Sequence, residues 1–586
     1  MTGNEAVARG AYEAGVTLAA AYPGTPSTEI LENIAEYKEI YSEWAPNEKV
    51  AMEVAVGGSI AGARSLAAMK HVGVNVAADP IFTFAYTGVN GGCVIVSADD
   101  PGMHSSQNEQ DNRYYARHAK MPMVEPSDSQ ECLDFIKESY KISEMYDVPV
   151  LFRMTTRVCH SKSLVSFGER EEVGIREYTK NIPKYVANPA NGKVLHVKLE
   201  EKLKQLEAYS NQTFLNRVEM NDNKIGIITS GVAYEYAREV FGDKASYLKI
   251  GFSFPLPQQM IKDFASKVET LYVIEELEPY MEMQIKAMGI AVKGKELLPI
   301  CGELNPDIIA EALLGTKREK LDKEEDKVVG RPPTMCAGCP HRGFFYELSK
   351  KKNVMISGDI GCYTLGAAPP LSATDTVICM GASVSAGHGF AMAAKQNNRE
   401  NKVVSVIGDS TFFHSGITGL VDMVYNKGNS TVVILDNRIT GMTGHQQNPG
   451  TGYTLMGDEA PQIDLIKICE AVGIQTIDVV NPLNLAESKA AIDKHLALDE
   501  PSVIITKWPC VLKKMTDDDF KNYQLKDRKI CVVDKDKCKK CKMCTKVGCP
   551  AISFTKETGS TIDPNMCVGC DVCMQVCPFG AIVKAE

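Results

Sequence analysis

The sequence predicts a multidomain α/β protein with parallel sheets that ends in a small α+β module. Its 586 residues are too many for one hydrophobic core and favour roughly 3–5 domains. Two apolar runs, residues 403–410 and 430–437, have the pattern of buried strands and flank a helical stretch, as successive strands of a parallel sheet do. Eight of the 19 cysteines lie between Cys538 and Cys577, which sets the C-terminal part apart from the rest.

The composition excludes several classes of protein. Hydrophobic residues make up 44% of the chain and charged residues 24%, as in ordinary globular proteins. The net charge of −10 argues against a nucleic-acid partner. No apolar run is long enough to span a bilayer, and the N-terminus lacks the features of a signal peptide, so we expect a cytoplasmic protein without a membrane partner. In that reducing compartment cysteines stay free, and the isolated ones are expected to be buried packing residues: Cys93, Cys132, Cys301 and Cys469.

The order of strand and helix patterns divides the chain into five parts. Residues 223–231 and 268–276 have strand–helix–strand texture. Residues 315–327 form a charged run that is typical of a solvated linker. The predicted parts are an α/β domain at 1–165, a charged connector at 166–220, a second α/β domain at 221–315, a third at 330–515 and the cysteine-rich module at 528–586.

Two runs of cysteines, residues 538–550 and 567–578, share one spacing: CxxCxxC, followed by Cys-Pro. Zinc sites pair two CxxC units and have no use for the third cysteine of such a run, which makes zinc the weaker alternative. The arrangement resembles that of bacterial two-cluster ferredoxins, in which the last cysteine of each run ligates the other cluster. The gap before Cys549 is four residues rather than the usual three. The resemblance implies two [4Fe–4S] clusters, one on Cys538, Cys541, Cys544 and Cys577 and one on Cys567, Cys570, Cys573 and Cys549.

A carboxylate and an amide follow the two predicted strands of the third α/β domain. Asp409 ends the first apolar run and Asn437 ends the second, 28 positions later. Ligands bind at the carboxyl ends of parallel strands, where these side chains suit a hard cation that holds a diphosphate. Taken alone, such pairs also cap loops in many α/β proteins. The segments resemble the thiamine-diphosphate signature GDG…NN, with Ser410 and Asp436 at the changed positions.

Several segments together resemble the α subunit of the indolepyruvate:ferredoxin oxidoreductase family, among the 2-oxoacid:ferredoxin oxidoreductases. They are AYPGTPSTEI at 21–30, CAGCPHRG at 336–343, GDIGCYTLG at 358–366, GDSTFFHSG at 408–416 and GMTGHQ at 441–446. The resemblance covers nearly the whole chain. It implies that 1–165 holds the aminopyrimidine of thiamine diphosphate, that 330–515 holds the diphosphate, and that 221–315 is a transketolase C-terminal-like domain. For the diphosphate side it implies Mg²⁺ on Asp409, Asn437 and the Ile439 carbonyl, with Gly408, Ser410 and Thr443 beside the cofactor.

The same resemblance implies a catalytic glutamate that hydrogen-bonds the aminopyrimidine. The family pattern has glycines nine and fourteen positions after it. Counted from Glu48 these positions are Gly57 and Gly62, whereas Glu53 meets only the first, with Gly62. We therefore favour Glu48 and keep Glu53 as the alternative. A solvated glutamate on an amphipathic helix is the interpretation without the resemblance.

Two further residues are implied to face the substrate. The segment at 21–30 resembles the family's YPITP loop, with Gly24 in place of isoleucine, and places Thr25 beside cofactor and substrate. The loss of that side chain would suit a bulky substrate. Arg117 matches the family's carboxylate-binding arginine, with Arg113 as the alternative, and both could also be salt-bridged surface residues.

A third cluster is implied between cofactor and tail. Cys336 and Cys339 form a CxxC motif, which taken alone would indicate a redox dithiol or half of a zinc site. The family has a proximal [4Fe–4S] cluster on a CxxC, a cysteine in a Gly-Cys loop and a late Pro-Cys. The implied ligands are Cys336, Cys339, Cys362 and Cys510.

The implied activity is oxidative decarboxylation of aryl 2-oxoacids to aryl-acetyl-CoA, with electrons leaving through three clusters to ferredoxin. Its cofactors are thiamine diphosphate and Mg²⁺, with CoA as co-substrate. A β subunit would complete an α₂β₂ enzyme, and this chain has no CoA-binding signature of its own. Three alternatives share parts of the pattern: a pyruvate or 2-oxoglutarate enzyme, a non-oxidative thiamine decarboxylase, which would need no clusters, and an electron-carrier subunit with an inactive α/β scaffold.

Overall fold

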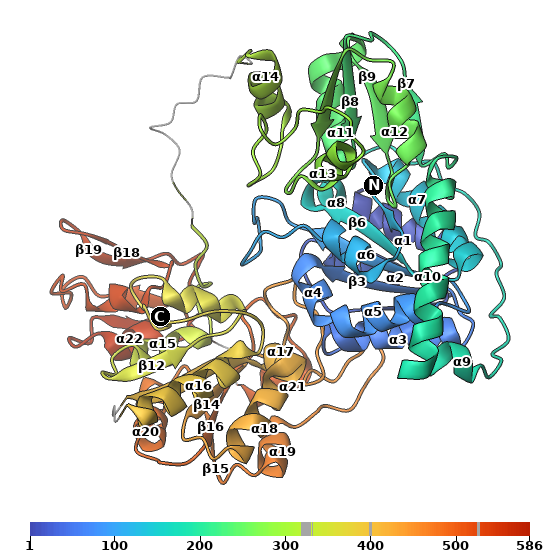
Figure 1. Ribbon diagram of the computed structural model, residues 1–586. Coiled ribbons are helices and arrows are strands. Elements are labelled where there is room, and N and C mark those ends of the chain that lie inside the picture. The colour runs from blue at the N-terminus through green and yellow to red at the C-terminus, as the bar shows by residue number, and fades with distance from the viewer. Residues whose placement is uncertain (318–329, 331, 398–400, 524, 526–527, 586) are drawn as a thin grey trace. The chain divides into compact units, whose positions relative to one another are not determined.

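The computed structural model describes residues 1–317, 330, 332–397, 401–523, 525 and 528–585 (Figure 1). The chain divides into two compact units, residues 1–323 and 324–586. Most of the predicted linker, 318–327, lies outside the described residues. The first three predicted parts share the first unit and the last two share the second, while the boundaries between the parts remain predictions.

The first unit is built on a seven-stranded sheet in the order β10-β5-β6-β4-β3-β1-β2. All neighbours are parallel except β10, which runs antiparallel to β5. The seven strands are β1 Leu18–Ala21, β2 Tyr41–Trp44, β3 Ser65–Lys70, β4 Cys93–Asp99, β5 Met123–Val124, β6 Val150–Thr155 and β10 Phe252–Phe254. Every residue of β4 and β6 is buried, as expected for a parallel sheet covered on both faces. The carboxyl ends of β1, β3 and β4 meet at one edge, because these strands are parallel neighbours.

Helices cover this sheet and begin where the chain provides caps. The Asn47 side chain accepts the Val50 N–H at 2.9 Å, which makes Glu48 the first residue of its helix. Ser27 precedes another helix, but its hydroxyl donates to the Gly24 carbonyl at 2.8 Å and closes the preceding loop instead. The helices are α1 Gly3–Glu13, α2 Thr28–Ile34, α3 Glu48–Ile60, α4 His71–Val76, α5 Ala78–Thr87, α6 Arg113–Ala119, α7 Ser129–Tyr146 and α8 Thr156–His160.

The predicted connector, residues 166–220, contains two helices and one strand of the second sheet of the first unit. It contains α9 Ile182–Tyr185, the 22-residue helix α10 Pro189–Ser210 and β7 Asn216–Glu219. β7 pairs antiparallel with β9 Ser246–Ile250 in a second sheet of order β11-β8-β9-β7. The predicted strands at 223–231 and 268–276 are confirmed as β8 Ile225–Thr229 and β11 Thr270–Ile274, which pair directly. The helices of this part are α11 Val232–Phe241, α12 Gln258–Ala265, α13 Tyr280–Ala287 and α14 Pro306–Leu314.

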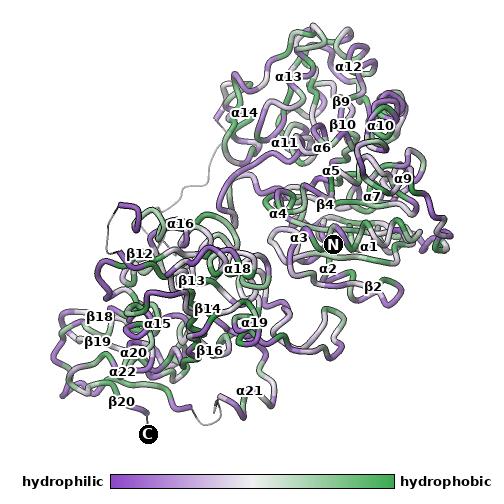
Figure 2. Tube along the Cα trace, turned by 60° about the horizontal axis from the view of Figure 1, so that its bottom comes forward, coloured by the Kyte–Doolittle hydropathy of each residue, from purple (hydrophilic) through white to green (hydrophobic). Residues whose placement is uncertain are grey.

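The second unit contains a five-stranded, fully parallel sheet in the order β12-β13-β14-β16-β15. Its strands are β12 Val354–Ser357, β13 Lys402–Gly408, β14 Thr431–Asp436, β15 Thr476–Val480 and β16 Ser502–Lys507. β13 and β14 confirm the two strands that the apolar runs predicted. Apolar residues gather along these strands and the helices packed on them (Figure 2). The main covering helices are α15 His341–Leu348, α16 Ala382–Gln396, α18 Ile417–Tyr425, α19 Leu465–Val472 and α20 Leu485–Leu496.

The predicted α+β module closes the second unit. It has two antiparallel pairs, β17 Cys531–Val533 with β20 Ile582–Lys584 and β18 Ile552–Thr555 with β19 Gly559–Ile562. A short helix accompanies each cysteine run, η5 Met543–Val547 and α22 Val572–Val576. Apolar residues of both short helices belong to the same core cluster as Phe344 of α15. The module therefore packs directly on the parallel-sheet domain.

The isolated cysteines are mostly where the sequence predicts. Cys93, Cys132 and Cys469 are buried, which confirms the prediction for them. For Cys301 the prediction is wrong: the residue is exposed, because it lies in an irregular surface segment beside the exposed Ile300. Among the described residues, no helix is both long and apolar enough to cross a membrane.

Candidate functional site

Two buried carboxylates mark the carboxyl edge of the second unit's sheet. Asp409 follows β13 directly, and Asp436 ends the neighbouring β14. Both are buried, and Asp409 has the Asn448 amide as a donor at 3.0 Å. Burial raises the pKa of Asp409, and the nearby Asp436 carboxylate raises it further. Asp436 is ion-paired with Arg438 at 3.9 Å, whereas the side-chain partner of Asp409 is a neutral amide, so the Asp409 carboxylate suits a divalent metal.

The loop after β14 brings the other predicted residues to the same edge. Asn437 is buried, and its side-chain oxygen accepts the Ile439 N–H at 3.2 Å. Ser410 accepts a hydrogen bond from the Thr440 hydroxyl at 2.9 Å. The Thr443 hydroxyl, further along the loop, donates to Gln446 at 2.6 Å. The predicted diphosphate residues thus lie on two adjacent strand ends and one connected loop.

Close packing fixes the backbone at Gly408. A Cβ there would lie 2.6 Å from Cε1 of Tyr363, so a larger residue has no room. Tyr363 is held in turn by its hydroxyl, which donates to the Ile360 carbonyl at 2.8 Å. A pocket opens beside Asp409 at this edge of the sheet. It is lined by both carboxylates and by two cations, Arg438 and Lys507.

The four cysteines predicted for the proximal cluster lie near one another and next to this loop. Burial raises the pKa of Cys339 to about 12, and the nearby Cys362 and Cys510 contribute to the shift. Cys336 in turn acts electrostatically on Cys362 and Cys510. The Cys510 N–H donates to the Asn437 carbonyl at 2.9 Å. A predicted cluster ligand is therefore bonded to a predicted metal ligand through the backbone.

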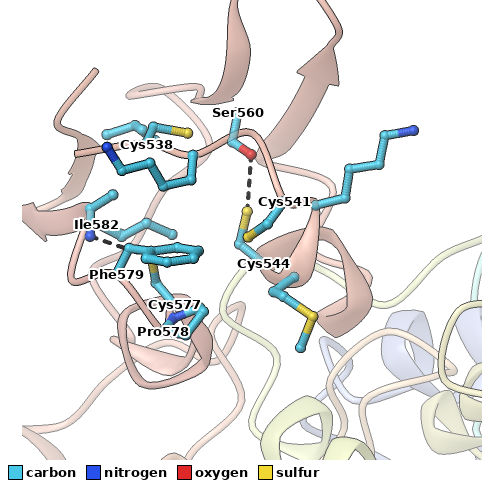
Figure 3. A pocket seen from close by; sticks show the side chains of 13 residues that line it. Cys538, Cys541, Cys544, Ser560, Cys577, Pro578, Phe579 and Ile582 are labelled. Atoms are coloured by element: carbon cyan, nitrogen blue, oxygen red, sulfur yellow. Dashed lines mark hydrogen bonds between the residues drawn. The ribbon is translucent and has the colours of Figure 1, made fainter. Parts of the chain in front are cut away.

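The eight tail cysteines gather in two pockets as the ferredoxin spacing predicts. One pocket is lined by Cys538, Cys541, Cys544 and Cys577 (Figure 3). The other is lined by Cys549, Cys567, Cys570 and Cys573. Each set combines three cysteines of one run with the last cysteine of the other. Within the described part of the chain no three His, Cys, Asp or Glu side chains converge as around a single metal ion. A four-iron cluster takes one thiolate per iron, so its ligands surround a space rather than a point.

A single arginine joins the CxxC loop to the second pocket. Arg342 is buried, and its guanidinium donates to the Cys336 carbonyl and the Val547 carbonyl, each at 3.0 Å. The second pocket is also lined by Gly338 of the CxxC loop. The proximal cysteines thus adjoin the pocket of Cys549, Cys567, Cys570 and Cys573, while the other pocket lies beyond it in the module.

In the first unit, burial separates the two candidate glutamates. Glu48 is buried at the start of α3. Its carboxylate packs against the backbone of α4 at Gly73: a Cβ added to this glycine would lie only 2.7 Å from Glu48 Oε1. Glu53 is exposed and pairs with Lys49. Only Glu48 has the enclosed setting in which one hydrogen bond is strong.

Lys70, which the sequence analysis did not single out, lies beside the loop of Gly24 and Thr25. It ends β3, and a Cβ at Gly24 would lie 3.3 Å from its side chain. Its ammonium donates to the Ser105 carbonyl at 3.0 Å, and the Ser105 hydroxyl donates to the Thr25 carbonyl at 3.3 Å. Burial lowers the pKa of Lys70, while Asp100 and Glu48 oppose that effect. The space left by Gly24 is therefore bordered by the aliphatic part of the Lys70 side chain.

The two predicted arginines lie elsewhere. Arg117 is exposed on α6, and no hydrogen bond or ion pair joins it to Thr25 or Glu48 within the described residues. Arg113 is fully buried and bonded to Asp111 at 2.9 Å and to Glu275 at 2.6 Å. Its charge is neutralised by this network, which ties the first sheet to the segment after β11.

Sequence reasoning missed several residues of the site. Asn448 and Lys70 contact distant segments, and no local pattern marked them, whereas Arg342 lies in the CAGCPHRG segment but was given no role of its own. Cys531 lines the second cysteine pocket, and its N–H donates to Cys567 Sγ at 3.3 Å. Its position seven residues before the first run was the available signal. His341 of the CPHRG segment lies with Nε2 3.5 Å from the Asn437 amide nitrogen.

Relatives of known name resemble the chain over its full length. An indolepyruvate oxidoreductase subunit IorA from Methanothermobacter thermautotrophicus is 41% identical over 99% of this chain and 96% of its own length. The corresponding subunit from Archaeoglobus fulgidus is 40% identical over 100% of this chain and 97% of its own. The chain belongs to this family. A 2-oxoglutarate synthase subunit KorA from Methanothermobacter marburgensis is 25% identical over 54% of this chain and 98% of its own length.

Family models match three parts of this indolepyruvate oxidoreductase family member. Residues 9–212 match "Pyruvate flavodoxin/ferredoxin oxidoreductase, thiamine diP-bdg", residues 359–506 match the C-terminal thiamine-pyrophosphate-binding domain, and residues 560–583 match the 4Fe-4S binding domain. A solved 2-oxoglutarate:ferredoxin oxidoreductase from Magnetococcus marinus is 19% identical over 54% of this chain and 64% of its own, with a TM-score of 0.45. The chain is thus a thiamine-diphosphate-dependent, iron–sulfur oxidoreductase of the 2-oxoacid:ferredoxin class.

Proposed function

We propose that this chain, with a partner β subunit, oxidatively decarboxylates aryl 2-oxoacids to aryl-acetyl-CoA and CO₂ and passes the electrons to ferredoxin. Indolepyruvate, phenylpyruvate and 4-hydroxyphenylpyruvate are the proposed substrates. The names of the full-length relatives support this substrate class. The observation that carries the electron-transfer part is the backbone bond between Cys510 and Asn437, because it joins the cofactor loop to the first thiols of the path.

Asp409, Asn437 and the Ile439 carbonyl are proposed to hold Mg²⁺ and, through it, the diphosphate. When bound, thiamine diphosphate supplies the electron sink that decarboxylation of a 2-oxoacid needs. Glu48 is proposed to accept a hydrogen bond from the aminopyrimidine and to favour the tautomer that takes up a proton. Its burial supports this role, because a carboxylate that is shielded from water holds its partner more tightly.

Lys70 is proposed to hold the substrate carboxylate, in place of the arginines that the sequence favours. Its stem lies against Gly24, and its ammonium is linked through Ser105 to Thr25. No carboxylate of the described residues forms an ion pair with it within 4.0 Å, so its charge is available to a ligand. Arg113 is already neutralised, and Arg117 faces solvent.

Three [4Fe–4S] clusters are proposed to carry electrons from the cofactor loop to the surface. The proximal one would use Cys336, Cys339, Cys362 and Cys510, and the tail pockets would hold the other two. CoA is proposed to enter through the β subunit, in an α₂β₂ enzyme of the cytoplasm. Buried Asp409, whose pKa is raised by burial and by the Asp436 carboxylate, suits a bound cation and so favours an active enzyme over an electron-carrier subunit with an inactive scaffold.

The test is turnover of the purified chain with its β subunit, under anaerobic conditions, against a panel of 2-oxoacids with CoA and a viologen dye. We expect the aryl 2-oxoacids to be used with the highest kcat/KM and aryl-acetyl-CoA to form. A preference for pyruvate or 2-oxoglutarate would overturn the substrate class. Iron without bound thiamine diphosphate, and no turnover of any 2-oxoacid, would indicate the electron-carrier alternative.

A further inference from the structure

The two halves of the cysteine-rich module differ sharply in charge. Residues 531–562 contain seven lysines and three acidic residues, a net charge of +4, in a chain whose total is −10. Residues 563–586 contain one lysine and three acidic residues, a net charge of −2. Four of the seven lysines lie within or between the cysteines of the first run, whereas the second run contains Asp571 and no lysine.

These lysines are exposed on the half of the module that holds the first cysteine run. All seven are exposed: Lys535, Lys537, Lys539, Lys540, Lys542, Lys546 and Lys556. We call them the lysine rim. Two of them, Lys539 and Lys542, line the pocket of Cys538, Cys541, Cys544 and Cys577 itself. Cys541, which lines the same pocket, is exposed as well (Figure 3), so a cluster in this pocket would lie near the surface beside Lys539 and Lys542.

The charge of the lysine rim is almost uncompensated. Of the seven, Lys537 forms an ion pair, with Asp534 at 3.0 Å, and it is the one rim residue that does so among those described. Lys535 and Lys540 donate to the neutral carbonyls of Ser560 and Glu557, which fixes their position without cancelling their charge. An exposed cluster of like charges with few ion pairs creates a local positive potential, which attracts an oppositely charged partner.

The other pocket adjoins the parallel-sheet domain. The pocket of Cys549, Cys567, Cys570 and Cys573 is lined by Gly338 and Arg342 from the CxxC loop of the parallel-sheet domain. It therefore adjoins the loop of Cys336 and Cys339, whereas the lining of the rimmed pocket includes the exposed Cys541, Lys539 and Lys542.

We propose that the lysine rim is the docking surface for the external electron acceptor, and that this acceptor is a small acidic protein carrying one electron at a time. The proposal rests on the proposed function, because it requires the tail clusters to carry electrons. One electron passes from the reduced cluster in the rimmed pocket to the acceptor, the cluster is oxidised and the acceptor reduced, and no bond forms or breaks. Opposite charges on the two surfaces raise the encounter rate and orient the acceptor over Cys541.

The test compares two charge-reversal triples in the complete enzyme. Lys539→Glu/Lys542→Glu/Lys546→Glu alters the rim and avoids the lysines that hold backbone carbonyls. Lys193→Glu/Lys198→Glu/Lys204→Glu makes the same change of charge on exposed positions of α10. Iron content and the electron paramagnetic resonance (EPR) spectrum of the reduced clusters show whether either variant has lost a cluster. Two readouts follow: the Kd of an acidic ferredoxin by calorimetry, and kcat/KM for that ferredoxin at several ionic strengths.

We expect the rim variant to weaken ferredoxin binding and kcat/KM by about tenfold to a hundredfold, and to lose most of the dependence on ionic strength. Turnover with a small uncharged quinone should stay at the wild-type level, and the α10 variant should behave as wild type. Wild-type Kd and salt dependence in the rim variant would overturn the proposal, as would an equal loss in the α10 variant. Tight binding of an RNA or of anionic vesicles, with no binding of ferredoxin, would also overturn it.

Two further outcomes separate this proposal from the proposed function. If the rim variant loses iron, the neutral triple Lys539→Gln/Lys542→Gln/Lys546→Gln takes its place. We expect it to weaken ferredoxin binding and to lower kcat/KM for ferredoxin, by less than the charge-reversal triple. If the wild-type enzyme binds acidic ferredoxin in a rim-dependent way but oxidises no 2-oxoacid, the proposed function fails and the docking surface stands. If it oxidises 2-oxoacids with the quinone but never binds acidic ferredoxin, the docking surface fails alone.

Discussion

At the scale of single residues, burial decides which charged side chains can take part in chemistry. Glu48 and Glu53 lie five positions apart on the same helix, yet one is enclosed and the other is solvated and paired with Lys49. Exposed pairs of this kind contribute little to stability or function. Lys70 and Arg117 show the same contrast among the cations. Glu48 is buried against α4 and Lys70 is half-buried against Gly24, whereas Glu53 and Arg117 are exposed.

Glu48→Gln should lower kcat by about 10²–10⁴-fold, because the amide keeps the size of the side chain but cannot drive the proton shift on the aminopyrimidine. The melting temperature and the iron content should stay unchanged. Glu53→Gln, measured in parallel, serves as the matched control and should retain most of the wild-type kcat. A large loss at Glu53 with little effect at Glu48 would move the catalytic role to Glu53.

Lys70→Met should raise KM for the 2-oxoacid by about tenfold to a hundredfold, in keeping with roughly 1.5–3 kcal/mol for a hydrogen bond to a charged group. Because burial lowers the pKa of Lys70, its proton is lost below the usual lysine value of about 10.4, and wild-type KM should rise as the pH rises through that lowered pKa. Lys70→Arg should keep KM independent of pH in the same range. Arg117→Ala should leave KM unchanged; a rise there equal to that of Lys70→Met would contradict the assignment.

At the scale of elements, the CxxC loop joins the cofactor domain to the ferredoxin-like module. Gly338 of this loop has a φ of +72°, and a Cβ there would lie 2.0 Å from Val568 of the second cysteine run. Arg342 fixes the loop from the other side. The loop therefore sets how closely the proximal thiols approach the second pocket.

Gly338→Ala should disrupt this junction, because the new methyl group would collide with Val568 as well as strain the backbone. We expect a lower melting temperature and slower reduction of the tail clusters by the 2-oxoacid, measured by stopped flow. Gly580→Ala is the matched control, since Gly580 has a similar φ of +59° and open space around its Cβ. Gly580→Ala should lower the melting temperature through backbone strain alone and leave the rate of cluster reduction unchanged. Equal effects of both variants on cluster reduction would show that the close approach at Val568 is unimportant.

Elements with strong local patterns were predictable from the sequence, and those held by distant partners were not. The apolar runs predicted β13 and β14 and so placed Asp409 and Asn437 at strand ends, and the cysteine spacing predicted which thiols share each tail pocket. β7 is short and half-buried, and it exists because β9 pairs with it from thirty residues away. The Asn448 amide reaches Asp409 across 39 residues of chain. Neither contact leaves a periodicity in the sequence.

At the scale of the whole molecule, the chain combines a cofactor site and an electron path that can be separated by mutation. Asp409→Asn should remove a metal ligand, and retention of thiamine diphosphate after gel filtration should fall to near zero. The iron content should remain at the wild-type level, because no cysteine is altered. Since the neutral amide also relieves the repulsion with Asp436, the melting temperature without cofactor should not fall. Retained cofactor and activity in this variant would show that the diphosphate lies elsewhere.

The most direct test of the central claim is an anaerobic EPR measurement of the chain with its β subunit after addition of indolepyruvate alone, without ferredoxin or dye. The path from the Asn437 loop through the proximal thiols to the tail pockets predicts that signals of reduced [4Fe–4S] clusters appear on mixing. It also predicts that Asp409→Asn gives no such signals with indolepyruvate but full signals with dithionite. Clusters that stay oxidised with indolepyruvate in the wild-type enzyme, while CO₂ is released and dithionite reduces them, would contradict the account.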